Sequence, residues 1–363
     1  MPETVYPQLN TLVSVQSAKL LTAQQLDQLL LQPSPTDLGL RLEQIGFFSQ
    51  SRLPAASQPA GQCLAQALDQ EWSGWLHWLQ TITATADPRL LRLLTWPERT
   101  YDLRVLLKSH ILQKDLHQLY SPLSLLPEEI LLTAGTAATP PAGLGPECPD
   151  APELCRWQAA CQTALADFKR HHSFSRVQLI LNCLQDQEMN QLAGQLEDTR
   201  IQTYTRTWLD LEWLAVLLQL RQEKGDSHRD WLQIRRSPVA GLRADISRLF
   251  QLDRKAQDQY LARTAYARLW QRAVGGAALQ PVAFEIGRRQ QLQQLRDAAR
   301  WEPFGLFPLL ALLGAKQQEI NLLRQINAGL SAGLSPGALR SRLFPEDNPD
   351  GGQTWASKVV PHA

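Results

Sequence analysis

Apolar residues recur along the chain with the spacing of α-helices. In several stretches leucine and isoleucine lie three or four residues apart, which places them on one helix face. These stretches contain Leu20, Leu26, Leu29 and Leu30 (within Gln16 to Leu31); Leu103, Leu106, Leu107 and Ile111; Leu211, Leu214, Leu217 and Leu218; and Ile320, Leu323 and Ile326. Alternation with period two is almost absent and β-branched residues are sparse, which favours helix over strand. The pattern predicts an all-α fold.

Four Ser-Pro pairs mark expected helix starts. A serine oxygen can accept hydrogen bonds from the free amides of a first helical turn, and proline is pre-set for the first helical position. The pairs are Ser34-Pro35, Ser121-Pro122, Ser237-Pro238 and Ser335-Pro336. Asp37 adds a capping-box-like arrangement three residues after Ser34. For each pair the alternative is a simple turn.

Three of the apolar segments are almost equally spaced. Leu103, Leu214 and Leu323 are separated by 111 residues (103 to 214) and 109 residues (214 to 323), and a Ser-Pro pair follows each of them. This spacing predicts three tandem helical repeats with approximate three-fold symmetry. We expect repeat 1 at 1–133, a linker and repeat 2 at 134–238, repeat 3 at 239–344 and a flexible tail at 345–363. Breaks rich in Pro or Gly occur near 134–152, 225–238 and 274–281.

Composition narrows the class of protein. The chain has 363 residues, 44% hydrophobic and 20% charged, which is ordinary for a globular protein. Its net charge of +1 argues against a nucleic-acid-binding surface across the whole protein. The longest mostly apolar run, Phe304 to Ala315, is shorter than the roughly 20 residues of a membrane span, so we expect a buried helix there. Five cysteines and no secretory signal pattern favour reduced thiols in the cytoplasm.

Several motifs follow one another along the chain: Leu20 to Leu30, Asp102 to Lys108, Leu126 to Ile130, Glu302-Pro303, Lys316-x-x-Glu319-Ile320-x-x-Leu323-Arg324, and the turn from Asn327 to Leu334. Taken in this order, they resemble the motifs of one family, the C subunit of V/A-type rotary ATPases, which is the d subunit of vacuolar enzymes. The family positions carried over, expected to be structural, are Leu103, Arg104, Lys108, Leu214, Glu302, Pro303, Lys316, Glu319, Leu323 and Arg324.

The resemblance implies a funnel of three repeats around a central cavity. Such a subunit sits between the central stalk and the membrane ring of proteolipids and passes torque between them. It is not an enzyme, because other subunits handle ATP. The resemblance therefore implies no cofactor, no bound metal, no nucleic-acid partner, and a cytoplasmic position peripheral to the membrane.

Two groups of side chains are candidates for interfaces. Trp72, Trp75 and Trp78 fall three residues apart on one helix face, where they either pack in a core or fit a partner's groove. Arg288 and Arg289, with Arg296 and Arg300, form the densest basic helix, which faces acidic partner loops, anionic headgroups or only solvent. Arg104 and Lys108, four apart, face either an acidic partner or water.

Two other functions remain open. One is a helical scaffold that binds a different soluble protein, with the repeats serving only for packing. The other is a metal-dependent helical enzyme that uses Cys148, Cys155, Cys161 or the His171-His172 pair, although the cysteine spacings exceed those of zinc pairs. The phosphate-binding pattern Gly-x-x-x-x-Gly-Lys-Ser/Thr does not occur in the sequence.

Overall fold

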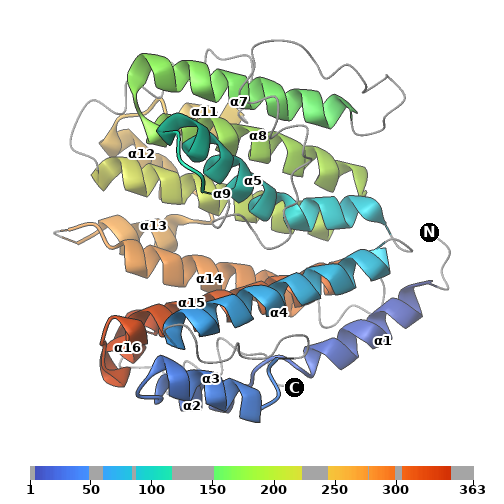
Figure 1. The fold of residues 1–363 in the computed structure, drawn as a ribbon. Coiled ribbons are helices and arrows are strands. Elements are labelled where there is room, and N and C mark those ends of the chain that lie inside the picture. The colour runs from blue at the N-terminus through green and yellow to red at the C-terminus, as the bar shows by residue number, and fades with distance from the viewer. Residues whose placement is uncertain are drawn as a thin grey trace. The chain divides into compact units, whose positions relative to one another are not determined.

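The computed structural model describes residues 5–48, 60–83, 87–116, 151–222, 244–276, 278–298 and 305–344, and all regular structure in them is helical (Figure 1). The predicted all-α class is confirmed. The chain divides into two compact units, each built from separate parts of the sequence. Unit 1 comprises Met1–Leu91, Asp198–Tyr204 and Gln280–Ala363, and unit 2 comprises Arg92–Glu197 and Thr205–Leu279.

Among the described residues, unit 1 contains the helices at the two ends of the chain. They are α1 (Val5–Ser17), α2 (Ala23–Leu30), α3 (Pro35–Gln44), α4 (Ala60–Thr83), α14 (Pro281–Ala298), α15 (Phe307–Ser331) and α16 (Pro336–Leu343). Helix α15 packs against α1, α3, α4, α14 and α16, and Figure 1 shows α4 running alongside it. The central position of α15 explains why its apolar residues are buried almost all around, as in Leu309, Leu312 and Leu323.

Unit 2 holds the middle of the chain. Its helices are α5 (Pro88–Leu112, from Arg92 onwards), α7 (Ala151–His171), α8 (Phe174–Gln195), α9 (Thr199–Gln222, from Thr205 onwards), α11 (Ala244–Leu249), α12 (Arg254–Leu261) and α13 (Ala267–Val274). Helices α7 and α8 form an antiparallel pair with extensive packing. The rings of Trp96 and Trp157 meet edge to face inside this unit, with centroids 5.1 Å apart.

The expected serine caps are found wherever the structure describes them. The side chain of Ser34 accepts a hydrogen bond from the Asp37 amide at the start of α3, and Ser335 does the same for Ala338 at the start of α16. The pairs at Ser121 and Ser237 lie outside the described residues. The expected stretch from Gln16 to Leu31 is interrupted after Ser17, because Thr22 and Gln25 form a capping box that starts α2.

The apolar run before Ala315 is a buried helix, as predicted. Pro308 lies in the first turn of α15 and does not interrupt the helix, because the first turn requires no amide from it. At the other end Gly333 adopts φ +75, and the Leu334 amide reaches back 2.9 Å to the Gly329 carbonyl. Over the described residues, no helix combines the length and the apolar character that crossing a membrane requires.

The predicted break near 274–281 is confirmed, since α13 ends at Val274, α14 begins at Pro281 and the two units meet there in sequence. The breaks expected at 225–238 and through most of 134–152, and the tail at 345–363, lie outside the described residues. The predicted three repeats rest on likeness between successive segments, whereas the two units are defined by their internal contacts. The units therefore do not test the repeats, which stay a prediction.

Candidate functional site

A buried ionic network lies at the centre of unit 1. Lys316 of α15 donates to Glu319 Oε2 at 2.8 Å, one turn further along the same helix. Its ammonium also lies 3.9 Å from Glu71 Oε1 on α4. All three side chains are nearly inaccessible to water, with Lys316 only 1% exposed. One positive charge therefore lies between two carboxylates in the interior of the unit.

Two aromatic rings and a backbone amide complete this network. Lys316 Nζ lies 3.8 Å from the centroid of Phe47 and 5.2 Å from that of Trp75, so it faces both rings. The Trp75 indole donates to Glu71 at 3.0 Å. The Leu21 amide donates to Glu319 Oε1 at 2.5 Å. The network thus joins α15, α4 and the chain segments next to α2 and α3.

Burial dominates the electrostatics of the network. Desolvation raises the pKa of Glu319, and the Lys316 ammonium and the Leu21 amide offset only part of that rise. The nearby Glu71 carboxylate acts in the same direction as burial. No substrate can reach groups that are this deeply enclosed, so the arrangement suits a structural tie and not catalysis.

The structure places most of the family-motif positions inside the units. Leu103, Leu214 and Leu323 are each at most 2% exposed. Arg324 is half-buried and pairs with Asp69 of α4 at 2.5 Å. Glu302 and Pro303 lie outside the described residues.

Arg104 and Lys108, the two cations of the α5 motif, have different surroundings. Arg104 is half-buried and donates to Asn182 Oδ1 of α8 at 2.6 Å. Burial lowers its pKa, and the charge of Glu212 offsets part of that effect. Lys108 is exposed. Arg104 therefore has a partner inside unit 2, and only Lys108 faces water.

The tryptophan stripe lies on α4, where two of its three members are enclosed. Trp72 and Trp75 are 5% and 4% exposed, whereas Trp78 is half-buried and meets the Trp75 ring at 5.5 Å. The geometry matches the packing interpretation for Trp72 and Trp75. Trp78 is the member of the stripe that keeps a partly accessible ring.

The basic helix is α14, and its arginines have partners within unit 1. Arg288 pairs with Glu285 at 3.4 Å, and Arg289 donates to the Leu343 carbonyl at 3.4 Å. Arg296 is buried and donates to Gln293 and Gln318. Arg300 lies outside the described residues. This helix therefore presents less unpaired positive charge than its sequence indicates.

The cysteine and histidine candidates do not form a cluster in the described part of the chain. Cys161 and Cys183 are buried, and burial raises the pKa of each thiol to about 12. The side chains of Cys148 and Cys155 lie outside the described residues, while His171 and His172 are exposed. Within the described ranges, no group of three or more His, Cys, Asp or Glu side chains could hold a metal ion.

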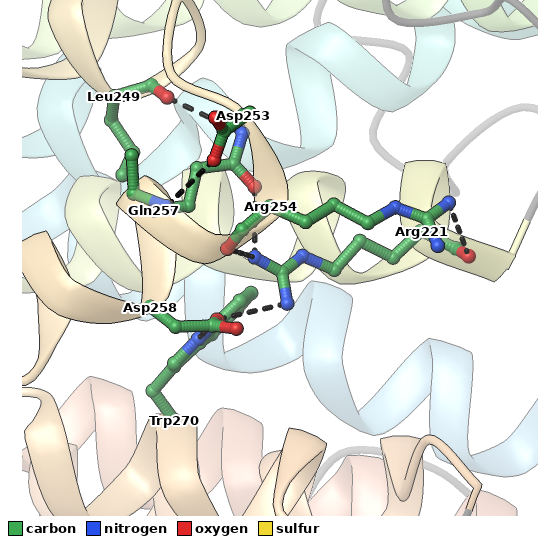
Figure 2. Close-up of polar contacts among 8 residues, drawn as sticks. Arg221, Leu249, Asp253, Arg254, Gln257, Asp258 and Trp270 are labelled. Carbon is green, nitrogen blue, oxygen red and sulfur yellow. Dashed lines mark hydrogen bonds and ion pairs between the residues drawn. The ribbon is translucent and has the colours of Figure 1, made fainter.

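A second polar network, in unit 2, was not expected from the sequence (Figure 2). Arg221, at the end of α9, pairs with Asp258 of α12 at 2.9 Å and donates to Gln257 Oε1 at 2.8 Å. Its guanidinium also lies 4.8 Å from the ring of Trp270, whose indole donates to Asp258 at 2.7 Å. The signal that the sequence offered was Trp270 within a basic segment. Such a signal does not reveal that Arg221, more than thirty positions earlier, contacts Gln257 and Asp258.

Comparison with known proteins identifies one family that the chain matches. The model of a family described as the ATP synthase (C/AC39) subunit matches residues 9–342. No curated protein matches the chain. The family match covers nearly the whole sequence, including both units and every motif position named above. The chain belongs to the ATP synthase (C/AC39) subunit family.

Proposed function

We propose that the protein is the non-catalytic central-stalk subunit that couples the rotating stalk of a V/A-type ATPase to its membrane proteolipid ring. The observation that carries the proposal is the family match over residues 9–342, which indicates a subunit of the ATPase complex other than the catalytic one. In this proposal the chain lies in the cytoplasm, is peripheral to the membrane, and binds the stalk and the ring.

The buried network of unit 1 supports a mechanical role. Torque passing through a subunit pulls on the connections between its helices. In unit 1, Leu21 near the N-terminus and Glu319 near the C-terminus are joined directly, and Lys316 connects that contact to α4. Truncating one member of such a buried network is strongly destabilising, because it leaves a buried charge without its partner. The three segments of unit 1 are therefore expected to depend on one another.

Co-purification is the first test. The tagged full-length chain is expressed in its own host, and membranes are solubilised under native conditions. The proposal expects proteolipid and central-stalk subunits to be recovered with it. A monomer that associates with neither would refute the proposal and favour the unrelated scaffold.

Coupling is the second test. Membranes from cells that lack the chain should show little ATP-driven ion uptake, and adding the purified protein should restore it. As a control, the same addition is made with a variant that carries Lys19→Glu and Lys169→Glu. Both positions are exposed and make no ion pair among the described residues. Full ion uptake without the chain would show that it does not couple the two parts.

A further inference from the structure

The segment that contains α12 and α13 has a strongly positive local charge. Positions 254–272 include five cationic residues and one carboxylate, whereas the whole chain has a net charge of only +1. The five are Arg254, Lys255, Arg263, Arg268 and Arg272, and all are exposed. Each helix has eight residues and is therefore only about 12 Å long. Because the helices also pack against each other, the five charges act over a small area.

The carboxylates next to these cations are already engaged. Asp258, the one carboxylate within the segment, accepts hydrogen bonds from Arg221 and Trp270 (Figure 2). Asp253, just before it, accepts the Ala256 amide and caps α12. The side chains of Lys255, Arg263 and Arg268 make no ion pair with any described residue. Their positive charge is therefore available to a partner.

The apolar side chains of these helices are turned inward. Leu261, Leu269 and Trp270 are at most 7% exposed, and within residues 244–276 no large apolar side chain is strongly exposed. A helix that lies in a membrane interface inserts apolar side chains between the headgroups. The described α12–α13 surface has no strongly exposed apolar side chain to insert, which disfavours a lipid bilayer as its partner.

The composition of the surface favours carboxylates. Four of its five cations are arginine, whose planar guanidinium can bind a carboxylate through two parallel hydrogen bonds. Arg221 of α9 also binds α12 through Gln257 and Asp258 and lies against the Trp270 ring of α13, so the surface is organised before a partner arrives. A rigid, charged surface of this kind gives fast association and selects acidic partners.

We propose that the exposed cations of α12 and α13 form a docking surface for an acidic segment of a neighbouring protein subunit. That this neighbour belongs to the rotor rests on the function proposed above, whereas the charge chemistry does not. The surface acts through Lys255, Arg263 and Arg268, with Arg254 and Arg272 beside them.

The test compares two variants of the full-length chain with equal changes in charge. One reverses Lys255→Glu, Arg263→Glu and Arg268→Glu. The control reverses Lys19→Glu, Lys108→Glu and Lys169→Glu, which are exposed elsewhere and also make no ion pair among the described residues. The probe is a fluorescein-labelled oligo-glutamate peptide, followed by anisotropy. A second arm uses vesicles of phosphatidylserine and phosphatidylcholine.

The first variant should bind the peptide at least about tenfold more weakly than the wild type, and the control within about twofold. The difference should shrink at high salt, because exposed charges are screened. Equal losses in both variants would overturn the proposal. So would wild-type binding to the vesicles but not to the peptide.

Two additions keep the result interpretable. If the reversed variant loses its helical circular dichroism, Lys255→Gln with Arg263→Gln and Arg268→Gln replaces it and should show a smaller loss in the same direction. Failure of the wild type to co-purify with an ATPase would refute the proposed function alone. The proposed docking surface would still be supported in that case if the first variant, and not the control, lost peptide binding.

Discussion

The backbone amide of Leu21 donates a hydrogen bond to the side chain of Glu319, 298 positions later in the sequence. This contact closes unit 1, in which the first and last parts of the chain share one core. Lys316 holds Glu319 in place for that contact, because it pairs with the other oxygen of the same carboxylate. The stability of unit 1 should therefore depend on the buried positive charge of Lys316.

Replacing Lys316 tests that dependence. Lys316→Met keeps the aliphatic part of the side chain but leaves Glu71 and Glu319 buried without their cation. We expect the free energy of unfolding to fall by about 3–5 kcal/mol, the usual cost of breaking a buried pair. Urea denaturation measures it. The matched control is Lys108→Met at an exposed position, which should change it by less than about 0.5 kcal/mol. Similar values for both variants would contradict the structure.

The raised pKa of Glu319 gives a pH dependence with a definite sign. Because the folded pKa lies above the usual value of 4.5, the native state binds the Glu319 proton more tightly than the unfolded chain does. This contribution to stability is complete below that value and is lost as the pH rises through the folded pKa. Glu319→Gln cannot titrate, so its stability should decline less than that of the wild type between pH 4.5 and the higher folded pKa.

The control for this pH effect is Gln294→Ala, an exposed and uncharged position on α14. Because neither residue titrates, its profile of unfolding free energy against pH should run parallel to that of the wild type. If Glu319→Gln also ran parallel, the carboxylate would be titrating with an ordinary pKa. Chemical denaturation at a series of pH values measures all three proteins.

The helices of this protein were largely predictable because their signals are local. Helical spacing placed Leu103, Leu214 and Leu323 on buried faces, and the caps at Ser34 and Ser335 depend on residues three positions away. The break between α1 and α2 was missed, although its signal was also local. The Thr22–Gln25 capping box starts a new helix within the apolar stretch, even though the helical spacing of leucines continues across the break.

The networks were less predictable, because they depend on tertiary contacts. The motif singled out Lys316, Glu319 and Arg324, yet nothing in it shows that Glu71, Phe47 and Leu21 surround them. In the same way, Arg289 looked like a free cation until the structure paired it with the Leu343 carbonyl of another helix. The pairing of Arg288 with Glu285, three positions earlier on the same helix, is local. Sequence spacing identifies neighbours on one helix, but not partners on another.

Gly329 is required by the close approach of α16 to α15. A Cβ at this position would lie 2.2 Å from Leu339 Cδ2 and 3.3 Å from its Cγ. Because Leu339 is buried and cannot move freely, Gly329→Ala should destabilise the protein by about 1–3 kcal/mol. Gly337→Ala is the control, since a Cβ there meets nothing within 4 Å. That change should be neutral or stabilising by up to about 1 kcal/mol in thermal unfolding.

The two buried thiols of unit 2 should resist alkylation. Only the thiolate reacts, and burial raises the pKa of Cys161 and Cys183 to about 12. At pH 8 iodoacetamide should leave both unmodified in the folded protein and modify both in urea, as peptide mass spectrometry would show. Rapid modification of either thiol in the folded state would mean that the packing of α7 against α8 opens readily.

Arg221 provides the sharpest test of the network in unit 2. Arg221→Lys keeps the charge but loses the planar group that faces Trp270 and reaches Asp258, Gln257 and the Arg254 carbonyl together. Because Asp258 is partly exposed, the ion pair itself contributes little, and most of the loss should come from the broken connections. We expect amides of α12 and α13 to exchange hydrogen at least about tenfold faster, equivalent to about 1.4 kcal/mol. Arg263→Lys, an exposed control, should leave that exchange unchanged, and equal exchange in the two variants would show that Arg221 does not hold the helices.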